Sequence, residues 1–309
     1  MPAPRVIHTA QALVDVTAVI PGLPSRGQNV MAAQWSQQAG GAVNILVAAA
    51  RSGAQCVHAG VIGTGPNGDL IRAALSEAGI GWSAPAVEGI DTAPCMVLVE
   101  PSGERTFVTL MGAERKLSVE GLDSSRPVPG DLVCVSGYSL LVDATREPLE
   151  QWLATLPAGV AVALDPGAEF ATLPTATREA MLARTTVWTS NQEEATDLTG
   201  VDGMAEAADA MQALLPEGAV AIVRDGDAGC AVRADGRTTV VPGFPQTPVD
   251  TNGAGDAHTG VLVAERSRGT GWEEACRRAN IAGAIQVTRH GPANSPTAAE
   301  IDGFLASWR

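Results

Sequence analysis

The sequence predicts an α/β protein in which one doubly wound, mostly parallel β-sheet carries helices on both faces, and two observations support this. Apolar, β-branched runs alternate along the chain with Ala- and Leu-rich segments of helical periodicity, a rhythm typical of parallel strands joined by helices. The chain has 309 residues, 45% apolar and 17% charged, which is enough to bury a large core. We therefore expect a single α/β domain over residues 1–309.

The alternation begins with a predicted strand at residues 5–8 and a helix at 42–52, followed by a strand at 56–62 and a helix at 70–78. After residue 130 it resumes with strands at 132–135, 160–164, 186–188 and 220–223, each followed by a helical or loop segment. The helix expected at 257–265 follows a glycine-rich turn.

Two segments, residues 14–37 and 94–111, read instead as short extended runs. In the second, Pro101-Ser102-Gly103 separates "APCMVLVE" from "ERTFVTLM", which predicts a hairpin. Because both segments are inserted into the large domain, we expect a small separate β-sheet that serves as a lid or as an oligomer contact. An antiparallel extension of the main sheet is the alternative.

Composition argues against several partners. The net charge is −14 and Lys116 is the single lysine, so binding to nucleic acid or to an anionic membrane surface is disfavoured. The N-terminus lacks the pattern of a secretory signal, and no apolar run approaches the ~20 residues of a membrane span. Five dispersed cysteines fit reduced, buried thiols, so we expect a cytoplasmic protein.

A G-x-G-x-x-G pattern at residues 63–68 raises the question of NAD binding. A dinucleotide fold places this turn in its first βα unit and an acidic residue about 20 residues later at a strand end, and neither condition is met. Pro66 also removes an amide that a pyrophosphate needs. We interpret the segment as a tight turn, with Asn67 and Asp69 helping a helix to begin at Leu70.

The segment "VDTNGAGDAHTG" has the character of an anion site. Asn252-Gly253-Ala254-Gly255 carries little side-chain bulk, so successive amides can point into one concavity at the positive end of a helix. Asp256 then stands beside that anion site, where a carboxylate can accept a proton from an attacking hydroxyl. A plain glycine turn with Asp256 as a helix cap is the alternative from the residues alone.

Residues Asp250 to Asp256 match D-T-x-G-A-G-D in full, and on this motif the chain resembles the ribokinase-like (PfkB) family of carbohydrate kinases. The similarity extends over nearly the whole chain. Further matches are Asp15 near the first strand, Gly40-Gly41-Ala42-Val43-Asn44 as G-G-x-x-N, Asn191 to Glu194 as N-x-x-E, and residues 63–68 as G-x-D-x-x-G with Gly65 in place of the acid.

The resemblance implies ATP-dependent phosphorylation of a hydroxymethyl group. Asp256 would be the general base, and the amides of Gly253, Ala254 and Gly255 would stabilise charge on the transferred phosphoryl group. Glu194, with Asn191, would hold Mg²⁺ through water on the ATP phosphates.

The remaining implied contacts divide between nucleotide, sugar and cation. The nucleotide would contact Arg224, Gly226 and Gly229, with Asn280 and Gly283 on one helix face near the adenine. A small sugar would contact Asp15, Gly40, Gly41 and Asn44. A possible K⁺ site would involve Asp250, Asn252 and Ser295.

We therefore predict a sugar kinase acting on a fructose-, ketodeoxygluconate- or ribose-like acceptor, and a homodimer formed through the lid. Ala42 replaces the lysine of true ribokinases, which puts ribose itself in doubt. A nucleoside or pseudouridine kinase of the same fold and a non-catalytic sugar or nucleotide sensor remain as alternatives.

Overall fold

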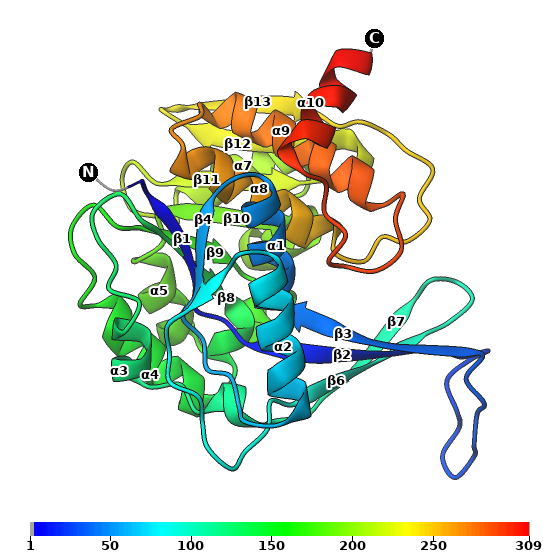
Figure 1. Cartoon of the computed structure of the whole chain (residues 1–309). Coiled ribbons are helices and arrows are strands. Elements are labelled where there is room, and N and C mark those ends of the chain that lie inside the picture. Colours follow the sequence, from blue (N-terminus) through cyan, green and yellow to red (C-terminus); the bar gives the residue numbers. More distant parts are fainter. Residues whose placement is uncertain (1–2, 309) are drawn as a thin grey trace.

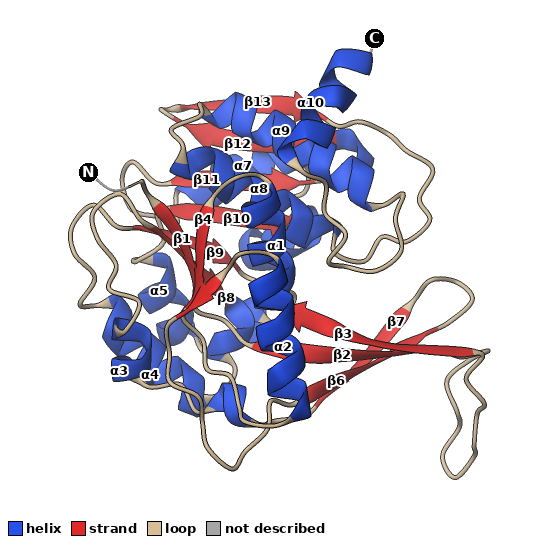
Figure 2. Ribbon diagram, in the orientation of Figure 1, coloured by secondary structure: helices blue, strands red, loops and turns tan. Residues whose placement is uncertain are grey.

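A computed structural model describes residues 3–308, and its centre is a nine-stranded sheet (Figures 1 and 2). The strand order is β13-β12-β11-β10-β9-β8-β1-β4-β5. Neighbouring strands are parallel except at one edge, where β12 pairs antiparallel with both β11 and β13. The strands are β1 (Arg5–His8), β4 (Gln55–His58), β5 (Gly81–Trp82), β8 (Leu132–Ser136), β9 (Ala161–Asp165), β10 (Val187–Asn191), β11 (Val220–Arg224), β12 (Gly229–Ala234) and β13 (Arg237–Pro242).

Helices cover both faces of this sheet, because adjacent residues of each strand face opposite sides. In β1, Val6 belongs to one buried cluster and Ile7 to the other. The Val6 cluster packs under α1 (Ala42–Arg51), α2 (Pro66–Glu77), α8 (Ala254–Ser267), α9 (Trp272–Gln286) and α10 (Ala298–Ser307). The Ile7 cluster packs under α3 (Val119–Asp123), α4 (Asp143–Leu153), α5 (Thr175–Leu182), α6 (Gln192–Thr199) and α7 (Met204–Gln212). The predicted doubly wound architecture is confirmed.

The lid is a second sheet, so its interpretation as an extension of the main sheet was wrong. Its four strands are ordered β3-β2-β6-β7 and project from the large domain (Figure 1). The bounds are β2 (Ala12–Val19), β3 (Gln34–Gly41), β6 (Pro94–Val99) and β7 (Arg105–Thr109). The predicted segment 14–37 was therefore too short at both ends, and residues 20–33 form a loop between its strands.

The turn at residues 59–65 corrects two further predictions. β4 ends at His58 instead of continuing to Ile62, and α2 begins at Pro66 instead of Leu70. The acid that caps α2 comes from a distance: Asp91 accepts hydrogen bonds from the amides of Asn67 (3.0 Å) and Gly68 (2.9 Å). A Cβ on Gly65 would lie 2.5 Å from the Asp91 carboxyl carbon. Asp91 thus occupies the space that an acid at position 65 would need.

Two global features complete the description. No helix within residues 3–308 combines the length and the hydropathy needed to cross a membrane. The five cysteines are buried and form no disulfide in the described chain.

Candidate active site

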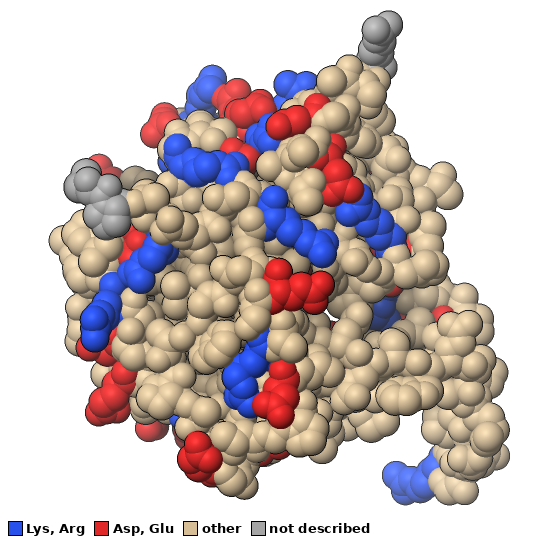
Figure 3. Space-filling view, in the orientation of Figure 1, with Lys and Arg blue, Asp and Glu red and all other residues tan. Residues whose placement is uncertain are grey.

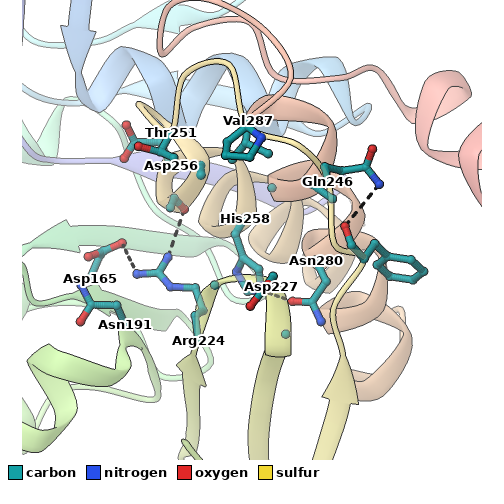
Figure 4. A pocket seen from close by; sticks show the side chains of 18 of the residues that line it. Asp165, Asn191, Arg224, Asp227, Gln246, Thr251, Asp256, His258, Asn280 and Val287 are labelled. Carbon is teal, nitrogen blue, oxygen red and sulfur yellow. Dashed lines mark hydrogen bonds and ion pairs between the residues drawn. The ribbon is translucent and has the colours of Figure 1, made fainter. Parts of the chain in front are cut away.

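The site lies where the carboxyl ends of three parallel strands face the start of α8 (Figure 4). Asp165 ends β9, Asn191 ends β10 and Arg224 ends β11, and the last two are direct partners in the sheet register. Parallel strands bring their carboxyl ends to one edge, which is the usual place for ligands in open α/β sheets. The fold therefore gathers residues that lie about 30 positions apart in the sequence.

Asp256 is the third residue of α8 and points to the junction between the large domain and the lid. Its Oδ2 accepts a hydrogen bond of 2.9 Å from Nδ2 of Asn44, at the start of α1. Burial raises the pKa of Asp256 to about 6; the Asn44 hydrogen bond and the Arg224 guanidinium act in the opposite direction, and the charge of Asp165 adds to the rise. A carboxylate with this pKa is charged at neutral pH and is a better proton acceptor than an ordinary aspartate.

The glycine-rich turn before Asp256 leads into α8 through one left-handed residue. Gly253 adopts a left-handed conformation with φ of 76°, and a Cβ there would lie 2.4 Å from the carbonyl oxygen of Pro292. The amide of Ala254 makes only a long hydrogen bond of 3.4 Å, to the carbonyl of Thr251. Glycine is thus required at 253 both by φ and by the close approach of the backbone.

Asp250 anchors this turn instead of facing the site. Its carboxylate accepts hydrogen bonds from the amides of Asn252 (2.9 Å) and Gly291 (3.0 Å) and pairs with Arg105 of the lid (2.5 Å). Burial alone would raise the pKa of Asp250, but these amides and the guanidinium outweigh burial and lower it. The charged Asp250 side chain therefore connects the turn to the C-terminal segment and to the lid.

Two cavities meet at Asp256. The larger, about 640 Å³, runs along the carboxyl ends of the strands to α9, and the smaller, about 510 Å³, lies between the turn and the β6–β7 hairpin of the lid. Both are lined by Thr251, Ala254, Gly255 and Asp256. One carboxylate and its neighbouring amides therefore face a nucleotide-sized space on one side and a lid-covered space on the other.

Two acids stand together in the larger cavity. Glu194 and Asp165 both line it, and burial together with the charge of Asp165 raises the pKa of Glu194 to about 7. Two neighbouring carboxylates of this kind are hard oxygen donors that suit Mg²⁺. Asp165 was not predicted from the sequence, because a lone acid at the end of a strand gives no signal by itself.

Arg224 supplies the positive charge on the nucleotide side. It donates to the carbonyl of Gly255 (3.1 Å) and to Thr259 (2.9 Å), and lies 3.7 Å from Asp165. Thr259 in turn donates to Asp165 (3.1 Å). The guanidinium thus joins the strand ends to the first turn of α8.

Asn191 and Glu194 also form a capping box at the start of α6. The Asn191 side chain accepts from the amide of Glu194 (2.7 Å), and the Glu194 carboxylate accepts from the amide of Asn191 (2.9 Å). Both residues line the larger cavity as well. The capping role and a role toward a nucleotide are therefore compatible, because the Glu194 carboxylate keeps its second oxygen and the Asn191 amide keeps its NH2 group.

The predicted nucleotide-binding residues lie in the same cavity, and the side chain of one of them, Asn280, is already hydrogen-bonded within the protein. Gly226, Gly229, Asn280 and Gly283 all line it. The Asn280 amide donates to the carbonyls of Val241 (3.0 Å) and Pro242 (3.1 Å), and its oxygen pairs with Nε2 of His258 (3.1 Å). Asn280 thus lines the larger cavity while its side chain also holds the cavity wall, and its contact with adenine stays a prediction.

The predicted sugar residues gather on the lid side. Asp15 folds over Gly40, where a Cβ would lie 2.1 Å from Oδ2 of Asp15, so the glycine makes room for the carboxylate. Gly41 ends β3, and Asn44 follows in the first turn of α1. Burial raises the pKa of Asp15 to about 6, and the charge of Asp256 adds to this rise.

The carbonyls near the predicted K⁺ position already have donors. The amide of Gln286 donates to the carbonyls of Asn252 (3.1 Å) and Gly291 (2.8 Å). Arg51 donates to the carbonyl of Ser295 (2.8 Å). These oxygens retain a second lone pair, but the Asp250 carboxylate is held by amides and Arg105.

Comparison with known proteins agrees with this architecture. The "pfkB family carbohydrate kinase" model matches residues 5–299. The uncharacterized sugar kinase YegV of Escherichia coli (strain K12) is 30% identical, covering 96% of this chain and 92% of the relative. The ATP-dependent ribose-1-phosphate kinase of Halopiger xanaduensis is 29% identical, covering 98% of each.

Among solved structures, a putative ribokinase II from E. coli in complex with ATP and Mg²⁺ superposes with a TM-score of 0.83 at 22% identity, covering 99% of this chain and 100% of that one. The fold is therefore ribokinase-like, with the second sheet as its lid. The family model, which spans almost the whole chain, shows that this protein belongs to the pfkB family of carbohydrate kinases, phosphotransferases with an alcohol group as acceptor.

Proposed function

We propose that the protein is an ATP-dependent sugar kinase that transfers the γ-phosphate to a primary hydroxyl of a small fructose-, ketodeoxygluconate- or ribose-like sugar. The observation that carries this proposal is the position of Asp256 at the junction of two cavities, directly after the glycine-rich turn. ATP would occupy the larger cavity and the sugar the lid side. A single group then faces both reactants.

In this mechanism Asp256 accepts the proton of the sugar hydroxyl while the hydroxyl oxygen forms a bond to the γ-phosphorus and ADP leaves. The amides of Gly253, Ala254 and Gly255, together with the positive end of α8, stabilise the negative charge on the transferred group. Arg224 lies on the nucleotide side of the same turn. Glu194 and Asp165 would hold Mg²⁺ through water, which neutralises charge on the ATP phosphates.

ADP release with Mg-ATP tests this proposal against ribose, fructose, ketodeoxygluconate, other hexoses, adenosine and pseudouridine. Turnover on a sugar supports it, and turnover confined to a nucleoside assigns the chain to nucleoside kinases. Ligand binding without ADP production from any acceptor would indicate a sensor. Replacing NaCl by KCl in the same assay tests the proposed K⁺ site, which predicts a higher kcat with K⁺.

The pKa of Asp256 predicts the acid limb of the pH profile. Because Asp256 must be charged to accept a proton, kcat/KM should fall as the pH drops through about 6. Asp165→Asn removes a charge that raises this pKa, so its acid limb should lie at lower pH than that of the unchanged enzyme. If both proteins lost activity at the same acidic pH at saturating Mg²⁺, the acid limb could not be assigned to Asp256.

The acid Glu194 is expected to set the requirement for Mg²⁺. Glu194→Gln should raise the Mg²⁺ concentration for half-maximal activity by about 10- to 100-fold, as for residues that orient metal-bound water. Glutamine can keep the hydrogen bond to the Asn191 amide, so the variant should fold. Glu193→Gln, at the exposed neighbouring position, is the control and should leave the Mg²⁺ titration unchanged.

We also propose a homodimer formed through the outer face of the lid. Trp35, Met96 and Val108 are 72%, 42% and 52% exposed on the face opposite Asp15, and the lid surface in Figure 3 is nearly free of charged side chains. Trp35→Asp should therefore reduce the mass measured by light scattering from two chains to one, because it places a charge in an apolar interface. Leu214→Glu, at an exposed position outside the lid, is the control. A mass of one chain for the unchanged protein would exclude the dimer.

We further propose a cellular compartment for the enzyme. Five buried thiols without a disulfide suit a reducing environment, so we place the enzyme in the cytoplasm. Cell fractionation that found it in an oxidising compartment would contradict this.

A further inference from the structure

The inner face of the lid carries a row of polar side chains that crosses all four strands. In the register, Asp15 of β2 is paired with Gln38 of β3 and with Cys95 of β6, and Cys95 is paired with Thr109 of β7. Directly paired residues share one face of a sheet. The contact of 3.2 Å between the Cys95 thiol and the Thr109 hydroxyl confirms this for the last pair.

This row faces the reacting centre. Arg105 and Phe107 are the alternate residues of β7 before Thr109, and both line the smaller cavity together with Asp256. The charge of Asp256 also acts on Asp15, and the charge of Asp15 acts on Cys95. The Gln38 amide oxygen reaches to 3.3 Å from the position of a Cβ on Gly291, in the C-terminal segment. The face of the lid that carries this row therefore borders the space beside Asp256.

Two groups in this space, the Asp15 carboxylate and the Asn44 amide oxygen, are hydrogen-bond acceptors without a donor in the described residues. Within the described residues, the Asp15 carboxylate receives no hydrogen bond, and only burial and the charge of Asp256 act on its pKa. The oxygen Oδ1 of Asn44 is buried without a partner, while its Nδ2 is used by Asp256. Such acceptors are satisfied by hydroxyl groups that donate, and a buried acceptor left unpaired is costly.

The neighbouring guanidinium groups are held elsewhere. Arg105 is bound to the Asp250 carboxylate (2.5 Å) and to the Thr251 hydroxyl (3.4 Å). Arg224 is bound on the nucleotide side to Gly255, Thr259 and Asp165. An anionic group on the acceptor would therefore meet two carboxylates, while the guanidinium groups of Arg105 and Arg224 already have partners, which is unfavourable.

From this arrangement we propose that the row Gln38–Asp15–Cys95–Thr109 recognises the acceptor, with Gln38 and Thr109 as specificity-determining residues, and that it selects an uncharged polyhydroxy acceptor over a sugar phosphate or sugar acid. The inference rests on the proposed kinase function and narrows its acceptor class. Family membership does not decide this point, because one relative is named for a phosphorylated acceptor.

The experiment compares matched acceptors that differ in charge: ribose with ribose 1-phosphate, and fructose with fructose 1-phosphate. Dissociation constants are measured by calorimetry with a non-hydrolysable ATP analogue, and kcat/KM is measured by ADP release. The uncharged member of at least one pair should bind at least ~100-fold more tightly than its phosphate, because like charges in contact are strongly disfavoured.

Variants test the row itself. Gln38→Ala and Thr109→Val should each raise KM for the uncharged acceptor by about three- to tenfold, with little change in kcat, because each removes a neutral hydrogen bond to the acceptor. The matched controls are Gln37→Ala and Thr106→Val, which change the same residue types on the opposite face of the same strands. Both controls should leave KM unchanged.

Three results would overturn the inference: tighter binding of the phosphorylated members, binding of none of the uncharged acceptors, or an unchanged KM in both row variants. If phosphorylated acceptors were preferred and Arg105→Ala abolished that preference, Arg105 would be the anion site instead. Failure of the kinase proposal itself would look different: no acceptor would yield ADP. Calorimetry would still show in that case whether the protein binds the uncharged or the phosphorylated member of each pair more tightly.

Discussion

Asp256→Asn is expected to lower kcat by about 10²- to 10⁴-fold with the protein fully folded, because an amide cannot take the proton of the attacking hydroxyl. The geometry favours an effect in this range, since Asp256 lies at the junction of the two cavities and next to the glycine-rich turn. The measurement is ADP release at saturating Mg-ATP and acceptor. Turnover near that of the unchanged enzyme would exclude Asp256 as the base.

Thermal unfolding provides the folding control for this variant. Burial raises the pKa of Asp256 to about 6, so the folded protein binds this proton more tightly than the unfolded chain does. Between about pH 4 and pH 6 the folded state holds more of the proton, and the contribution of this group to stability falls as the pH rises. At pH 8, Asp256→Asn should therefore have a Tm at least as high as that of the unchanged protein, and the difference should shrink toward pH 4. A lower Tm at pH 8 would show that the carboxylate stabilises the fold.

Gly253→Ala is expected to have the second-largest effect, on activity and stability together. A Cβ at this position would lie 2.4 Å from the carbonyl oxygen of Pro292, and φ is 76°. The turn must then shift, which moves the amides that face the transferred group. Misplacing one such donor costs about 10²- to 10³-fold in kcat.

Gly269→Ala is the matched control at the other end of the same helix. Gly269 has φ of 82°, and a Cβ there would have no neighbour within 4 Å. Gly269→Ala should lower the free energy of unfolding by roughly 1 kcal/mol, because alanine disfavours a left-handed backbone conformation. It creates no steric clash and should keep full activity. If Gly253→Ala lost no more stability than Gly269→Ala and kept its kcat, the close approach at Pro292 would not matter for the site.

Local patterns were sufficient for the architecture and for the central motif. The alternation of strand and helix periodicity predicted the parallel sheet, because a sheet buried on both faces needs continuous apolar strands. The low bulk of residues 252–255 before a helix predicted the turn, because glycine permits the backbone conformation seen at Gly253. The resemblance then supplied an expected role for Asp256, Asn191 and Glu194.

Other features depended on contacts between distant residues and were missed or misplaced. The start of α2 was placed four residues late because its cap is Asp91, which lies 24 positions after Asn67. Asn280 lines the larger cavity, but the sequence did not indicate that His258 and two carbonyls at the end of β13 use its side chain. Asp165 was missed because a lone acid at a strand end is uninformative until Arg224 and Glu194 stand beside it.

The sequence by itself determined the fold class, the glycine turn and the identity of the acid that follows it, since these depend on periodicity and on residues adjacent in the chain. Only the tertiary structure decided which side chains remain available at the site. Pairing across the lid aligns Gln38, Asp15, Cys95 and Thr109, and the Asp250 carboxylate occupies Arg105. Charge and hydrogen-bonding capacity at a site depend on what each group already contacts, and those contacts join residues more than 100 positions apart.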